Sequence, residues 1–152
     1  MKAPPALRTP RLHTIGYEGK TVAEFLAQLT AAGVSLLVDV RAVAASRRPG
    51  FSKTSLAAAL REVGIDYLHL RALGTPKDGR EAARRGQGAR MREIYARQLA
   101  TPEAELAMVQ LEASARERPS ALLCFEAAAA ACHRAVIAER LSATDGFAVV
   151  DL

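Results

Sequence analysis

The stretch Ser35-Leu36-Leu37-Val38-Asp39-Val40-Arg41 decides the fold that we expect for this chain. It is a near-continuous apolar run with charged residues at its end, a pattern typical of a strand covered on both faces in a parallel sheet. Gly33, just before it, suits the left-handed conformation that ends a helix. Outward from this strand, short apolar runs alternate with amphipathic segments. The alternation predicts strand–helix–strand units and a mainly parallel sheet.

The other predicted elements follow the same alternation. Thr21 and Glu24 have the spacing of a capping box at a helix start. Thr101 and Pro102 are an N-cap residue followed by proline at the first helical position. In that later helix we expect Leu106, Val109 and Ala113 to face inward. The remaining strands are predicted at 12–15, 65–70, 121–125 and 147–151, with further helices around 56–63, from about 90 to 99, and over 132–141.

Together these elements predict one α/β domain over residues 12–152. Its sheet is open and mainly parallel, with about five strands and helices on both faces, a Rossmann-like three-layer arrangement. Residues 71–88, with four glycines, form the least regular stretch, and its role stays open. Residues 1–11 carry Lys2, Arg8 and Arg11 among prolines without the apolar segment of a secretory signal, so a disordered leader is expected.

Composition limits the possible partners. A formal net charge of +5 favours acidic or phosphorylated partners. No apolar run approaches the roughly 18 residues that a membrane-spanning helix needs. The two cysteines, Cys124 and Cys132, are too few for a disulfide scaffold, and they are expected to be reduced thiols in a cytoplasmic protein. Whether they ever pair stays open.

Ligands of open parallel sheets bind in the crevice beyond the carboxyl ends of the strands. This rule selects Gly16-Tyr17-Glu18 after the first strand and Arg41 after the second. It also selects Arg71 to Gly74 after the third strand and Cys124 to Glu126 at the end of the fourth. The Arg41 guanidinium could hold phosphate or carboxylate with two hydrogen bonds. The alternative is a structural ion pair with Asp39 or Glu126. The candidate ligand-binding residues are Gly16, Tyr17, Arg41, Arg47, Arg48 and Arg134.

Cys132-His133-Arg134 is expected at a helix N-terminus, where free amides and the helix dipole favour anions. The candidate catalytic residues are Glu126, His133 and Cys132, although a buried helix with Val136, Ile137 and Leu141 favours a core position for Cys132 over a nucleophilic role. The spacing of Cys124, Glu126, Cys132 and His133 matches no compact metal-ligand pattern, so no metal or other cofactor is expected. His69, within a strand, is expected to be a satisfied buried histidine.

Four stretches resemble the domain-of-unknown-function 488 family of small bacterial and archaeal proteins. The resemblance implies a compact α/β domain with shared polar residues at Arg41, Arg47, Arg48, Glu126, Cys132, His133 and Arg134. Two features depart from the family: its Gly-His-Ser type turn is here Gly16-Tyr17-Glu18, and Ala127–Ala131 replaces a polar stretch. The matching stretches are Thr14-Ile15-Gly16-Tyr17, Leu37 to Arg41 with Ser46-Arg47-Arg48, Phe51-Ser52-Lys53 with Gly64 to Leu70 and Leu73-Gly74, and Leu122 to Glu126 with Cys132-His133-Arg134.

Several functions fit these observations. The first is binding of a phosphorylated or nucleotide-like anion, with Glu126 and His133 as acid–base groups of a hydrolase or transferase. The second is nucleic-acid binding through the basic segment Arg80–Arg97, although few aromatic residues are present for stacking on single strands. Asp39-Val40-Arg41 is similar to a rhodanese strand end, but the Cys-x5-Arg spacing of sulfurtransferases is absent. A structural role, the oligomeric state and enzymatic activity itself stay open.

Overall fold

The computed structural model describes residues 9–126 and 133–152. Its five strands form one open, all-parallel sheet, which confirms the predicted α/β fold. The strand order is β3-β2-β4-β1-β5. The strands are β1 (Arg11–Gly16), β2 (Leu36–Asp39), β3 (Asp66–His69), β4 (Ser120–Cys124) and β5 (Ala148–Asp151), each within two residues of its predicted bounds.

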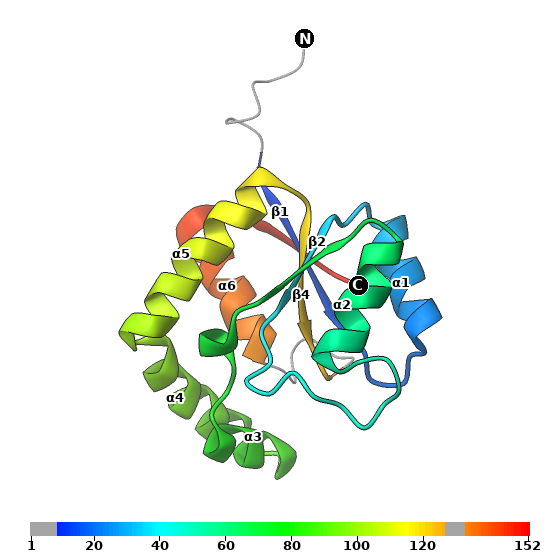
Figure 1. The fold of residues 1–152 in the computed structure, drawn as a ribbon. Coiled ribbons are helices and arrows are strands. Elements are labelled where there is room, and N and C mark those ends of the chain that lie inside the picture. The colour runs from blue at the N-terminus through cyan, green and yellow to red at the C-terminus, as the bar shows by residue number, and fades with distance from the viewer. Residues whose placement is uncertain (1–8, 127–132) are drawn as a thin grey trace.

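Helices cover both faces of the sheet (Figure 1). On one face lie α1 (Val22–Ala31) and α2 (Lys53–Glu62), and on the other lie α5 (Pro102–Glu117) and α6 (His133–Asp145). A 3₁₀ turn at Arg71–Leu73 leads to the paired helices α3 (Lys77–Arg84) and α4 (Gly88–Leu99). None of the helices in the described residues is long and apolar enough to cross a membrane.

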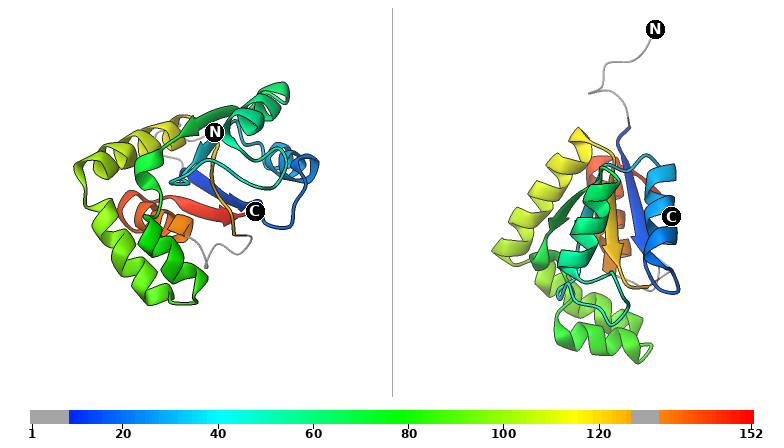
Figure 2. Two further views of the ribbon diagram at one scale, coloured as in Figure 1. Left: turned by 60° about the horizontal axis from the view of Figure 1, so that its bottom comes forward. Right: turned by 45° about the vertical axis from the view of Figure 1, so that its right-hand side comes forward.

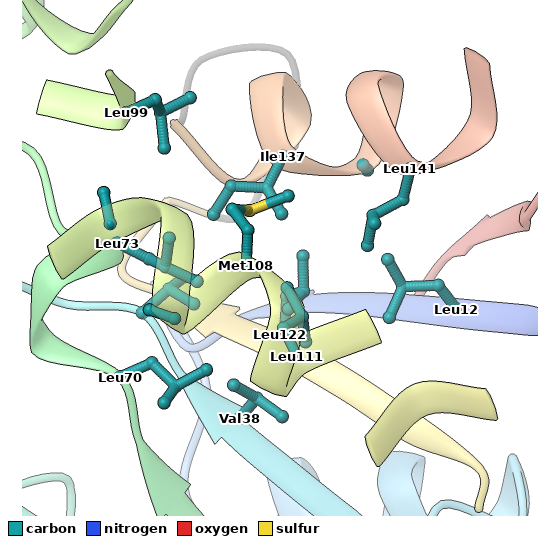
Figure 3. Close-up of a cluster of buried hydrophobic side chains, with 14 of the residues drawn as sticks. Leu12, Val38, Leu70, Leu73, Leu99, Met108, Leu111, Leu122, Ile137 and Leu141 are labelled. Carbon is teal, nitrogen blue, oxygen red and sulfur yellow. The ribbon is translucent and has the colours of Figure 1, made fainter. Parts of the chain in front are cut away.

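Each face of the sheet has its own hydrophobic core. Phe25 and Leu29 of α1 and Leu56 and Leu60 of α2 pack with the strand residues of one face, and all four are fully buried. Figure 3 shows the other core, where Leu111 of α5 and the α6 residues meet the opposite face. Apolar side chains therefore alternate between the two cores along β2 and β4, as expected for strands buried on both sides, whereas the edge strand β5 is exposed. The residues labelled in Figure 3 are Leu12, Val38, Leu70, Leu73, Leu99, Met108, Leu111, Leu122, Ile137 and Leu141.

The structure confirms the predicted N-terminal caps of α1 and α5 and the predicted end of α1 at Gly33. Glu24 donates its backbone N–H to Thr21 Oγ1 at 3.1 Å, and Thr21 donates its own to Glu24 Oε1 at 3.2 Å, which completes the capping box. Thr101 caps α5, with Pro102 in its first turn. Gly33, after α1, has φ +73°, a conformation that suits glycine.

The predicted inward face of α5 is wrong. Leu106 and Val109 are 73% and 66% exposed, and Ala113 is exposed as well. The helix instead buries three alanines, one methionine and one leucine against the core: Ala104, Ala107, Met108, Leu111 and Ala115. Alanine allows a helix to approach its neighbours closely, and three of the five buried residues are alanines.

Helix α3 was not predicted, because its sequence has almost no apolar residues to set a period. Only Gly79 and Ala82 of this helix are buried. The neighbouring helix α4 was predicted from Met91, Ile94, Tyr95 and Leu99 on one face; Met91, Tyr95 and Leu99 are buried and Ile94 is half-buried. The stretch described as least regular therefore contains a helix that packs through a glycine and an alanine.

The strand order shows which edge of the sheet is expected to bind a ligand. The chain leaves β1 and β2 through α1 and α2 on one face, whereas it leaves β4 through α6 on the other. Since β4 lies between β2 and β1, the connections diverge at its carboxyl end. A crevice at such a switch point is where ligands bind to open parallel sheets.

Candidate functional site

The carboxyl ends of β1, β2 and β4 bring most of the predicted residues together. We call this group the carboxyl-edge site; it consists of Gly16, Tyr17, Asp39, Arg41, Glu126, His133 and Arg134. In Figure 1 this edge faces the bottom of the view, where the loop between β2 and α2 also lies. Three of its residues, Asp39, Arg41 and Arg134, are buried charged side chains. Burying charge costs several kcal/mol per ion unless partners compensate.

Asp39 and Arg41 form a buried bidentate ion pair. Arg41 Nε donates to Asp39 Oδ1 at 2.9 Å and Nη2 donates to Oδ2 at 2.7 Å. The backbone N–H of Arg41 also donates to Oδ1, at 3.0 Å. Asp39 is fully buried, and its Oδ2 accepts a further hydrogen bond from the hydroxyl of Tyr67. Of the two alternatives for Arg41, the structure therefore contains the ion pair with Asp39.

The remaining Arg41 donors face protein groups too. Nη1 donates to the Phe51 carbonyl at 2.8 Å and lies 3.4 Å from the Tyr17 hydroxyl. The guanidinium carbon also lies 5.4 Å from the centre of the Tyr17 ring. Burial alone would lower the pKa of Arg41, but the hydrogen bonds and charge of Asp39 outweigh it and raise that pKa. Arg41 thus positions the strand end and the loop that carries Phe51.

Gly16 permits the closest approach in this region. A Cβ on Gly16 would lie 1.7 Å from the Glu126 carbonyl oxygen and 2.6 Å from Arg134 Nη1. That nitrogen donates to the same Glu126 carbonyl at 2.7 Å. Arg134 is fully buried, and burial lowers its pKa while the charges of Asp151 and Glu126 oppose the shift. A side chain at position 16 would therefore displace the contact that seats Arg134.

His133 begins α6 and reaches back to β2. Its Nε2 lies 2.7 Å from the Val40 carbonyl, so this nitrogen carries the hydrogen of the neutral ring. The His133 ring meets the ring of Tyr95 edge to face, with centroids 5.3 Å apart. Burial lowers the pKa of His133 to about 4, assisted by the positive charges of Arg134 and Arg80. At neutral pH His133 is therefore uncharged.

Glu126 differs from His133 in its proton affinity. Burial raises the pKa of this half-buried carboxyl, although the charge of Arg134 opposes the shift. Its Oε2 lies 3.2 Å from the sulfur of Cys124, which is disulfide-bonded in the structure. The expectation of a reduced thiol is therefore wrong at Cys124. Because such a sulfur has no proton to donate, a protonated Glu126 is the group able to donate in this contact. Cys132 and Ala127–Ala131 lie outside the described residues.

The loop after β2 adds cationic groups at the same edge. Arg48 donates through Nε to the Lys20 carbonyl at 3.0 Å, and its Nη2 donates to the same oxygen. Arg47 is exposed, and among residues 9–126 and 133–152 it has no hydrogen bond or ion pair. Burial and the charge of Arg134 lower the pKa of Lys20, against the opposing charge of Glu24. Lys20 and Arg134 therefore repel each other across the turn that follows β1.

Sequence reasoning missed three residues of this region. Lys20 and Tyr67 were not singled out, and Arg80 was assigned only to the basic segment. The register of β2 with β3 pairs Leu37 with Tyr67 and Asp39 with His69, so the position of Tyr67 in the third predicted strand was the available signal. His69, expected to be buried and satisfied, is half-buried, with Nε2 2.7 Å from the Arg41 carbonyl.

Two surface cavities lie apart from the residues of this site. One, of about 690 Å³, lies at the amino ends of the strands, beside Arg11, His13 and Arg118. The other, of about 440 Å³, lies between α6 and β5. In the part of the chain that the structure describes, no three or more His, Cys, Asp or Glu side chains are grouped to hold a metal ion. We therefore assign no metal ligands among those residues.

The fold and this site define an open, switch-point α/β domain with buried charge at its carboxyl edge. The model of the family described as domain of unknown function DUF488 matches residues 21–141. The chain belongs to the DUF488 family, as its resemblance implied. No curated protein and no solved structure matches the chain.

Proposed function

We propose that the carboxyl-edge site binds a small phosphorylated or nucleotide-like anion. The observation that carries this proposal is the positive charge gathered beside the β1–α1 turn, where burial and the charge of the buried Arg134 lower the pKa of Lys20. An anion held beside Lys20 offsets this repulsion. Arg47, on the adjacent loop, supplies a third positive charge that is not committed to an acid among the described residues.

The proposal gives the other residues distinct roles. Arg41 acts as a positioning residue, since its guanidinium is held by Asp39 and the Phe51 carbonyl. Gly16 allows the backbone to approach Arg134. Glu126, whose pKa is raised by burial, is the acid–base group if the bound anion reacts by hydrolysis or group transfer. His133, neutral and bonded to the Val40 carbonyl, orients the start of α6.

Thermal unfolding in the presence of orthophosphate, nucleotides and sugar phosphates tests this proposal. A ligand at about 100 times its Kd stabilises the fold by about 2.7 kcal/mol, which raises the Tm of a domain of this size by several degrees. We expect Lys20→Ala and Arg47→Ala to reduce the shift. The matched control is Arg61→Ala, which removes an exposed arginine from the last turn of α2.

The thermal-unfolding results distinguish binding at the carboxyl-edge site from no binding there. A shift in wild type and in Arg61→Ala that is lost in Lys20→Ala supports the carboxyl-edge site. If no anion raises the Tm of wild type, or if all three variants respond equally, the proposal is wrong. Arg41→Ala is unsuited to this test because it leaves the buried Asp39 without its ion-pair partner.

A further inference from the structure

We propose that the α3–α4 hairpin, residues Lys77–Leu99, is a docking surface for the phosphate backbone of duplex nucleic acid. This inference goes beyond the small-anion site and does not rest on it. It starts from the distribution of charge. The hairpin contains Lys77, six arginines and three acidic residues, so its formal net charge is +4. The formal net charge of the whole chain is +5. Nearly all the excess positive charge of the protein therefore lies on this one pair of helices.

Much of this charge is exposed and uncommitted. Arg85 and Arg90 are exposed, and in the described part of the chain neither side chain has a hydrogen bond or an ion pair. Arg84 makes only a 3.4 Å hydrogen bond to the Arg80 carbonyl. Arg97 pairs with Glu93 on the same helix, but its side chain is 76% exposed. Such exposed pairs contribute little to stability, so these side chains can turn to another partner.

The hairpin lies at the carboxyl end of the sheet. Figures 1 and 2 show α3 and α4 near the carboxyl ends of the strands, and α4 buries Met91, Tyr95 and Leu99 in the core that it shares with α5 and α6. Gly74, in the loop that enters α3, packs closely against the segment that follows β2. A Cβ on Gly74 would lie 2.2 Å from the backbone nitrogen of Ala42. Tyr95 of α4 touches His133 at the start of α6. A polyanion on the hairpin would therefore lie next to the carboxyl-edge site.

The surroundings of the charge favour nucleic acid over other polyanions. The large exposed apolar side chains of the described residues all lie outside the hairpin. Without them it has neither the apolar face that enters a membrane surface nor the apolar anchors that centre a protein interface. Arginine outnumbers lysine six to one here, and its planar guanidinium binds phosphate oxygens in pairs.

The kind of nucleic acid follows from the aromatic residues. The hairpin has one aromatic side chain, Tyr95, and it is fully buried. Bases of a single strand would have no ring on which to stack. Contacts restricted to the phosphate backbone suit a duplex and carry no direct sequence information. We therefore infer binding to duplex DNA or RNA without sequence preference.

Fluorescence anisotropy with a labelled duplex, measured across a salt series, tests this inference. The variant is Arg85→Ala/Arg90→Ala, and the charge-matched control is Arg11→Ala/Arg61→Ala, two exposed arginines at the opposite end of the domain. Each lost phosphate contact lowers the slope of log K against log salt by about 0.9 on B-DNA. We expect the hairpin variant to lower the slope by about 1.8 and the control to leave it unchanged. Duplex DNA and duplex RNA of the same sequence form separate arms.

Three results would overturn the inference: no binding by wild type, equal loss in both variants, or equally tight binding of an acidic peptide. The same variants test the small-anion proposal independently of this inference. The Tm shift with phosphorylated ligands should persist in Arg85→Ala/Arg90→Ala, whereas Lys20→Ala should lose that shift and retain the salt slope of the hairpin.

Discussion

The carboxyl-edge site and the α3–α4 hairpin are neighbours, and both depend on arginine, but its side chains have opposite environments in the two regions. Arg41 and Arg134 are buried, and each donates to named protein oxygens. Arg85, just after α3, and Arg90, in the first turn of α4, are exposed to solvent. The first environment fixes a conformation, and the second leaves charge available. The contrast separates arginines whose loss should unfold the protein from arginines whose loss should change only its binding.

The largest effect is expected from Arg41→Ala. It removes the partner of a fully buried carboxylate, and breaking a buried ion pair in this way costs about 3–5 kcal/mol. Urea unfolding of the single and double variants measures the cost. Asp39→Ala/Arg41→Ala should lose less than the sum of its two single variants, because no charge is left unpaired. A loss below about 1 kcal/mol for Arg41→Ala would remove the distinction between the two regions.

The next largest effect should follow Gly16→Ala. The new methyl group would overlap the Glu126 carbonyl oxygen, and overpacking against backbone costs about 3 kcal/mol. Gly88→Ala is the matched control in the hairpin, where a Cβ meets no atom within 4 Å and φ is not positive. Because alanine is the better helix former, the control should be neutral or slightly stabilising. Equal losses in the two variants would contradict the tight seating of Arg134.

The pH dependence of stability tests the buried histidine at the edge. Unfolded His133 binds its proton near pH 6.5, but in the fold its pKa is lowered to about 4. Stability is therefore complete above pH 6.5, falls as pH drops from 6.5 to 4, and is level below that, a loss of up to about 3 kcal/mol. His13, whose pKa burial also lowers, contributes in the same direction. The comparison of wild type with His133→Gln isolates the contribution of His133, and identical pH profiles would count against its burial in neutral form.

The smallest effect is expected from Arg85→Ala/Arg90→Ala. Exposed side chains without partners contribute little, so the free energy of unfolding should change by less than about 0.5 kcal/mol. Urea unfolding alongside the anisotropy measurement checks this. A loss above 1 kcal/mol would mean that these arginines support the fold, and any effect on duplex binding would then need another explanation.

The sequence predicted the strands well because their signal is local. Runs such as 35–41 are apolar on both faces, and capping residues such as Thr21 and Thr101 identify helix starts within the chain itself. The inward face of α5 could not be predicted in this way. Two apolar stripes share its helical period, one through Leu106, Val109 and Ala113 and one through Met108, Leu111 and three alanines. Only tertiary packing selects the second. Helix α3 buries only Gly79 and Ala82, so its sequence lacks the periodic pattern of apolar residues by which a helix is predicted.

The candidate site was predictable in position but not in detail. The topological rule selected the carboxyl ends, and the buried charges Asp39, Arg41 and Arg134 lie there. The sequence could not decide between an ion pair and a free guanidinium at Arg41, because that choice depends on side-chain geometry. Lys20 was missed because its proximity to Arg134 joins the turn after β1 to the start of α6, a contact between distant segments.

The position of β4 in the sheet has a consequence for synthesis of the chain. Leu12 of β1 and Leu36 of β2 both pair with Ser120, and β4 separates the two strands. While the ribosome has made only the first hundred or so residues, β1 therefore has no neighbour to pair with. The edges of β1 and β2 that pair with β4 stay open until β4 emerges, a condition that favours aggregation of nascent chains. Truncation before β4 should leave a product that depends on chaperones, whereas addition of β4 closes the centre of the sheet in one step.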